Sequence, residues 1–462
     1  MWYGTALFAH GIFPQPAFFG QSYGTMFESL LIVPLYLCGW PLHIAQPVIT
    51  AFMGIVAFLF GSVYCFKKEK YNSAFFCVLF LALTGWQWDV VTSMRCYFTG
   101  LPIAVIGCIL LNDPEAGNAK VFCGSLLTVI GAVWSASALS LLGIGYTYFI
   151  WNYRKSINLW ISFACGNIVG IILFVSRKVF FERHPDYIIF KMTSHISLKA
   201  FIQNMGLLPR RLAENFFGGW IGAILIPAVI LFFIYQYYNK EMWKHLTITI
   251  LSVFGSLFML SSTQMNAYNE NTINYCQLRM LLYMTFLGLL LMILLSCNEN
   301  NKESHVGWKK IIIISGIMIV SVFVKGSFFE RALEDPDSVL YGRGAVNYMD
   351  VRTLYDTGEK IIKAASKNEA DILISSDFNL SQTYGFSALY YDTPYVFYLP
   401  TYDRRVWVYN DLLRQKKKKI MFYDFLKNGE LKINIEDTGE KSVIEHLEKN
   451  HNIYRHIVEV NT

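Results

Sequence analysis

Long apolar runs with almost no charge are the feature that most restricts how this chain can fold. The first run extends from Pro41 to Phe66, and nine more follow at about 72–88, 98–111, 120–136, 138–151, 157–176, 218–238, 245–262, 277–296 and 311–328. A helix needs about 20 apolar residues to cross the hydrocarbon core of a bilayer. Several runs are near or below that length, but the pattern as a whole predicts a bundle of about ten transmembrane helices over residues 41–329.

The charged residues divide the chain into two parts. Residues 1–329 hold 21 Lys/Arg and 12 Asp/Glu, a net charge of +9, whereas residues 330–462 hold 18 and 21, a net charge of −3. Charged residues make up 16% of the whole chain, against about 25% in soluble domains. We therefore expect a membrane part followed by a water-soluble part. The positive charge lies at membrane flanks and indicates no nucleic-acid partner.

The basic clusters predict the orientation of the bundle. If every run crosses once, four clusters fall on one side: Lys67/Lys68/Lys70, Arg154/Lys155, Lys240/Lys244 and Lys302/Lys309/Lys310. By the positive-inside rule that side is the cytoplasm. Residues 1–40, a loop at 177–217 and residues 330–462 then face outward.

The stretch from Phe18 to Trp40 precedes the first membrane-length run and has a mixed character. It is apolar and aromatic, yet it contains a Gly-Gln-Ser-Tyr-Gly turn and one carboxylate, Glu28. Segments of this kind usually lie in the membrane interface. Two interpretations stay open: an interfacial helix that forms one wall of an outer active site, or a helix that only supports the bundle.

Residues 330–462 have the pattern of a small α/β unit. Short segments rich in β-branched and aromatic residues predict strands at 371–375, 395–399, 419–423 and 452–460, and helices are expected at 353–368 and 442–449. His446, His451 and His456 are spaced by five, which fits no common metal motif, so we predict surface positions for them.

No metal or cofactor is expected from the sequence. All nine cysteines lie between Cys38 and Cys297, mostly inside apolar runs, and no CxxC pair occurs. Small buried apolar side chains explain this distribution better than disulfides or a zinc site.

The polar residues favour chemistry at the outer membrane surface. Transporters usually place charges near the middle of the membrane, but here the charged residues gather at the predicted outer ends of the runs. They include Glu28, Asp89, Arg95, Arg210, Arg211 and Arg279.

Four segments together resemble a known family. FFGQSYGTMFESLL resembles the first outer loop of polytopic GT-C glycosyltransferases, in the bacterial group related to protein mannosyltransferases. PLHIAQPVITAFMGIVAFLFG resembles their next helix, and GAVWSASALSLL and QLRMLLYMTFLGLLL resemble later segments, in the same order along the chain.

The resemblance implies an inverting transfer of a sugar from a polyprenyl-phosphate donor to a lipid, glycan or protein acceptor. The reaction takes place on the outer face of a bacterial cytoplasmic membrane, within membrane lipids, and the C-terminal α/β domain is extracytoplasmic. Such a reaction needs a carboxylate to take a proton and cations for the leaving phosphate. We therefore expect Glu28 and Asp89 to be catalytic and Arg210, Arg211 and Arg279 to bind phosphate. Gln21, Tyr23 and Arg95 complete the expected substrate-binding set.

The chain departs from the family at its start. Neither the first helix of the family nor the acidic residue that follows it precedes the Gly-Gln turn. The sequence thus suggests a true start farther upstream, and inactivity for a chain that begins at Met1. A flippase for lipid-linked glycans and an inactive truncated scaffold are the alternatives.

Overall fold

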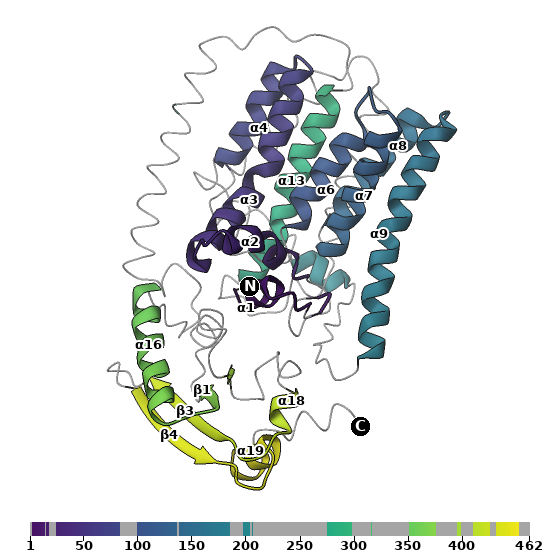
Figure 1. Ribbon diagram of the computed structural model, residues 1–462. Coiled ribbons are helices and arrows are strands. Elements are labelled where there is room, and N and C mark those ends of the chain that lie inside the picture. Colours follow the sequence, from purple (N-terminus) through teal and green to yellow (C-terminus); the bar gives the residue numbers. More distant parts are fainter. Residues whose placement is uncertain are drawn as a thin grey trace. The chain divides into compact units, whose positions relative to one another are not determined.

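The computed structural model describes eleven ranges and two single positions: residues 2–13, 15–17, 25–83, 99–135, 138–184, 197–203, 275–297, 351–375, 395–398, 410–425 and 431–451, with 206 and 316. Most of these residues are helical (Figure 1). The chain divides into two compact units. The first unit combines Met1–Ile49, Arg177–Lys191 and Ala345–Thr462, and the second combines Thr50–Ser176 with Met192–Gly344.

Helices occupy every predicted apolar run that the structure describes. They are α3 (Leu42–Lys67), α4 (Tyr71–Leu83), α6 (Gly100–Leu111), α7 (Asn118–Trp134), α8 (Leu139–Tyr153), α9 (Ile157–Arg183) and α13 (Tyr275–Cys297). The predicted runs at 218–238, 245–262 and, apart from residue 316, 311–328 lie outside the described residues. Helical structure is thus confirmed for seven of the ten runs.

Within the part of the chain that the structure describes, two of these helices, α3 and α9, are long and apolar enough to cross a membrane by length and composition. The apolar helices α6 and α7 are shorter, as is the apolar part of α13 at Phe286–Cys297. The prediction of about ten spans therefore stays a prediction.

The core of the second unit is formed by side chains from α3, α4, α6, α8 and α13 (Figure 1). The last half of α13 is buried on every side, from Phe286 to Cys297. A helix that is apolar all round is typical of the centre of a bundle. Four of the described cysteines, Cys65, Cys77, Cys108 and Cys297, are buried free thiols as predicted, whereas Cys38, Cys123 and Cys165 are exposed.

Helices α6 and α7 approach each other closely along two pairs of glycines. A Cβ atom placed on Gly107 would lie 2.6 Å from the Thr128 backbone nitrogen and 2.7 Å from the Gly124 carbonyl oxygen. One placed on Gly131 would lie 2.5 Å from the Gly100 carbonyl oxygen. Because backbone atoms fill this space, only glycine fits, as in close helix pairs of membrane proteins.

The first unit begins with two short helices, α1 (Trp2–Ala9) and α2 (Phe27–Leu37). They pack together, and the Thr5 hydroxyl donates a 3.1 Å hydrogen bond to the Ser29 carbonyl. Helix α2 lies within the predicted interfacial stretch. Helix α1 was not predicted, because its eight residues are too few to give a periodic signal.

The C-terminal part of the first unit contains a four-stranded sheet in the order β2-β1-β3-β4. Its strands are β1 (Ile372–Ser375), β2 (Tyr395–Tyr398), β3 (Lys419–Phe425) and β4 (Leu431–Asp437). Strand β1 runs parallel to β2 and β3, and β4 is antiparallel to β3. The predicted strands at 371–375, 395–399 and 419–423 are confirmed, β4 was missed, and 452–460 lies outside the described residues.

Helices cover both faces of this sheet, as the alternation of side chains along a strand requires. Ile372 and Phe422 face α18 (Asn410–Leu413) and α19 (Val443–His451). Leu373 and Met421 point to the opposite face and pack against α16 (Val351–Lys367). The helices predicted at 353–368 and 442–449 correspond to α16 and α19.

We predict that Gly107→Ala destabilises the second unit by about 1–3 kcal/mol, as is usual for overpacking. The new methyl group has to displace the backbone of α7, because the Thr128 backbone nitrogen and the Gly124 carbonyl oxygen lie within 2.7 Å of it, beside the Thr128 hydroxyl oxygen at 2.5 Å. Thermal unfolding of the purified chain in detergent measures the effect. Gly143→Ala on α8 is the matched control, since no atom lies within 4 Å of its added Cβ; equal melting temperatures for the two variants would contradict the close contact.

Candidate functional site

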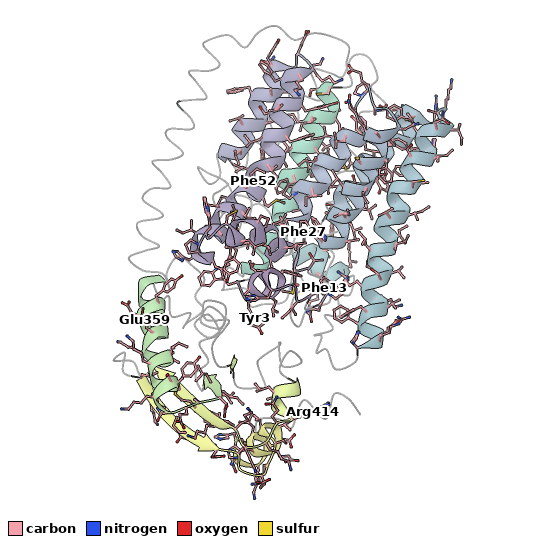
Figure 2. All side chains as sticks on the ribbon, viewed as in Figure 1. Tyr3, Phe13, Phe27, Phe52, Glu359 and Arg414 are labelled. Carbon is pink, nitrogen blue, oxygen red and sulfur yellow. The ribbon has the colours of Figure 1, made fainter. Side chains whose placement is uncertain are left out.

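Glu28 is the one candidate catalytic residue whose side chain the structure describes. It lies in the first turn of α2 and is fully buried, together with Ser29 and Ile32 on the same helix. Figure 2 marks this pair of helices by Tyr3 on α1 and Phe27 on α2. A carboxylate near a helix N-terminus is stabilised by the helix dipole. Burying one is costly unless the charge is compensated or serves a function, so Glu28 stays a candidate for the site.

The side chains of the other predicted site residues lie outside the described part of the chain. Gln21, Tyr23, Asp89, Arg95, Arg210 and Arg211 lie outside the described residues. Arg279 belongs to α13, but its side chain is outside the described part of that helix. A site that joins these residues therefore remains a prediction.

A second buried carboxylate, Asp113, lies in the turn between α6 and α7. Its Oδ1 atom is 3.0 Å from Lys68 Nζ and its Oδ2 atom is 2.7 Å from Lys120 Nζ. The side chain is only 4% exposed. Lys68 also pairs with the exposed Glu115 at 2.8 Å, and the Tyr153 hydroxyl donates to the Asp113 carbonyl. This group, which we call the Asp113 cluster, neutralises its charges internally and has the character of a structural element.

The Asp113 cluster shows which turns share one end of the second unit. Lys68 follows α3, Asp113 follows α6, and Tyr153 ends α8, so these three turns meet. Arg154 and Lys155 come directly after Tyr153. The first two basic clusters thus lie at one end of the second unit, while their place on one side of a membrane, and the assignment of that side to the cytoplasm, stay predictions.

The sheet carries a third cluster, which the sequence did not predict. Glu436 on β4 accepts from two histidines of α19: its Oε2 atom is 2.9 Å from His446 Nε2 and 2.8 Å from His451 Nε2. His446 is buried, with 7% exposure, so its predicted surface position is wrong. His451 is partly exposed, and His456 lies outside the described residues. Carboxylate and imidazole groups in this arrangement are able to hold a metal ion.

The sequence did not predict this cluster because it did not predict strand β4. Without β4, Glu436 has no neighbour, and a spacing of five on α19 places two residues on different faces of an ideal helix. The alternation of Leu431, Ile433 and Ile435 with polar residues is the signal for a strand that could have revealed it.

Electrostatics in the Glu436 cluster favour the ionised carboxylate. Burial tends to raise the pKa of Glu436, but hydrogen bonds from His451 and His446 outweigh it and leave the pKa lowered. The Asn434 side-chain amide donates a 3.0 Å hydrogen bond to the second carboxylate oxygen, Oε1. Both oxygens of Glu436 therefore have defined partners.

No protein family, no curated protein and no solved structure matches the chain.

We predict that Asp113→Asn destabilises the second unit by about 1–3 kcal/mol at neutral pH, the usual range for a lost partner of a buried polar group. The change leaves Lys68 and Lys120 facing each other without the anion between them. Thermal unfolding measures the loss. Glu115→Gln removes a carboxylate that is 77% exposed, so its effect should stay within about 1 kcal/mol; an equal effect of both variants would contradict the role given to Asp113.

We also predict that the stabilisation by the Asp113 cluster depends on pH. Burial tends to raise the pKa of Asp113, but hydrogen bonds with Lys120 and Lys68 outweigh it and lower the pKa. The ionised form therefore stabilises the fold above the unfolded carboxyl pKa of about 3.9, and this stabilisation disappears as the pH falls through the folded-state value. The melting-temperature difference between wild type and Asp113→Asn should shrink in that acidic range.

Proposed function

We propose that the chain is a membrane-embedded glycosyltransferase of the GT-C type, with about ten transmembrane helices and an extracytoplasmic C-terminal α/β domain. It transfers a sugar from a polyprenyl-phosphate donor to a lipid, glycan or protein acceptor on the outer face of the membrane. The observation that carries the proposal is the fully buried Glu28 in the first turn of α2, inside the Gly-Gln…Glu segment that resembles the family.

The surface of α9 supports a membrane location. The described buried residues of this helix are Gly166 and Gly170, which face α7: added Cβ atoms there would meet Ser125 and Val129. Large apolar side chains are exposed along the rest, among them Ile157, Ile161, Ile168, Ile171, Ile172, Leu173, Phe174 and Val175. A soluble protein rarely exposes an apolar surface of this extent. Lipid is the solvent that suits it.

The grouping of the chain supports the proposed topology. The first unit combines Met1–Ile49, Arg177–Lys191 and Ala345–Thr462. These segments largely correspond to the three that the basic clusters assign to the outer side. Glu28 and the sheet then belong to the same compact unit, which we propose lies on the outer side.

The proposed reaction is a single displacement. The acceptor hydroxyl attacks the anomeric carbon, the bond between this carbon and the phosphate oxygen breaks, and polyprenyl phosphate leaves with the bonding electrons. Glu28 takes the proton of the hydroxyl, because a hydroxyl is a weak nucleophile until a base removes its proton. Arg210, Arg211 and Arg279 are the proposed cations for the phosphate, since a guanidinium matches phosphate oxygens in geometry and charge.

We predict that Glu28→Gln reduces sugar transfer by roughly 100-fold or more, the range for loss of a general base. The amide has nearly the same shape but cannot accept the proton. The assay uses the full chain in lipid nanodiscs with a panel of fluorescent polyprenyl-phosphate sugars, and it measures the release of polyprenyl phosphate. Glu359→Gln on α16 is the matched control, because Glu359 is 63% exposed and pairs only with Lys363 one helical turn away among the described contacts.

Two outcomes would count against the proposal. Equal rates of polyprenyl-phosphate release for wild type and Glu28→Gln would show that Glu28 is not the general base. Movement of the donor across sealed vesicles without release of polyprenyl phosphate would favour the flippase. Unchanged thermal unfolding of Glu28→Gln would show that a lost rate is not a lost fold.

A further inference from the structure

We propose that Glu436, His446 and His451 form a binding site for one divalent transition-metal ion of the zinc class. The site joins the edge strand β4 to α19. It shares no residue with the proposed transfer reaction and does not depend on it.

The distances fit a metal with small adjustments. One ligand atom from each of the three residues lies within 4.8 Å of the others, and both imidazole Nε2 atoms are within 3 Å of the same carboxylate oxygen. Around a tetrahedral zinc ion with bonds of 2.0–2.1 Å, neighbouring ligand atoms are about 3.3 Å apart. Glu436 Oε2 therefore needs to move away from the two histidine nitrogens by less than an ångström, and the histidine ligand atoms, which lie within 4.8 Å of each other, need to reach the same spacing.

The orientation of the two rings distinguishes this cluster from a chance ion pair. Two imidazoles aim the same nitrogen at one oxygen, which without a metal requires a proton on each Nε2. A metal ion replaces both protons and satisfies the three groups together. Metal-binding histidines are usually oriented by a further contact, and each ring has one: His446 contacts Asn450, and the ring of His451 lies 4.4 Å from that of Phe422.

The surroundings hold the ligands in place. Helix α19 begins with a capping box, in which the Ser442 and Glu445 side chains each accept from the backbone amide of the other residue. Val443 and Leu447 anchor the same helix in the core of the sheet. Glu436 is fixed on its strand opposite Ile420, and its Oε1 atom accepts from Asn434. The ligands are therefore placed before a metal arrives.

The donor set selects the class of metal. Two imidazoles and one carboxylate suit zinc and its neighbours, whereas magnesium and calcium prefer oxygen ligands only. Three protein ligands leave a fourth position of a tetrahedral site open to water. His451 and Glu436 remain 25% and 21% exposed, so an ion is able to reach the site from solvent.

The test measures metal binding directly on the full chain in detergent. After removal of metals with a chelator, the chain is titrated with Zn²⁺ and with Co²⁺. We expect one Zn²⁺ ion per chain by elemental analysis and a visible Co²⁺ absorption spectrum of tetrahedral nitrogen and oxygen coordination. Loss of a residue that only orients a ligand weakens metal sites by 10–100-fold, so Glu436→Gln and His451→Gln should each weaken Zn²⁺ binding by roughly 100-fold or more.

A matched control separates the site from general surface binding. Glu440→Gln makes the same change at a residue that is 80% exposed, pairs with Lys417 and lies in the turn before α19; it should bind Zn²⁺ like the wild type. Circular dichroism establishes that each variant is folded. Absence of stoichiometric Zn²⁺ binding by the wild-type chain at micromolar concentrations overturns the proposal without reference to any variant. Equal binding by Glu436→Gln, His451→Gln and wild type overturns it as well.

Discussion

The close approach of α6 and α7 is the contact on which the second unit depends. In the lipid surrounding that the proposed function requires, apolar side chains gain nothing by leaving one apolar surrounding for another, so helices associate through close packing and small residues. Gly107 and Gly124 allow the backbones to meet, and other glycines continue the pattern: Gly145 of α8 lies against Cys108, and Gly166 of α9 against Ser125. A bundle assembled in this way needs little polar contact in its interior.

The charges of the described bundle are accordingly placed at its end. Asp113 is buried there between two lysines, and the Asn112 amide donates to the carbonyls of Cys108 and Gly145, which joins α6 to α8. A buried ion pair adds little stability when compared with an apolar contact, but removal of one partner is costly. Such a cluster fixes which turns meet and in what register, while the apolar side chains provide most of the attraction.

How much the sequence could predict depended on the length of each pattern. The long apolar run of α3 and the short β-branched segment at Ile372–Ser375 were predictable, because each repeats one signal over its whole length. Helix α1 is too short for that, and β4 was hidden because its alternation falls in a charged segment. The contacts of Glu436 with His446 and His451 depend on pairing with β3 and on the direction of α19, and both are tertiary properties.

The proposed metal ion would matter for α19 in particular. A helix of nine residues is unstable alone, so contacts at both of its ends have to hold it. The capping box secures the start, and Val443 and Leu447 secure the middle. The last turn depends on the contact of His451 with Glu436. The same Glu436 oxygen also accepts a hydrogen bond from His446. A metal ion at this point would join the edge of the sheet to the end of the helix more firmly than hydrogen bonds in contact with water.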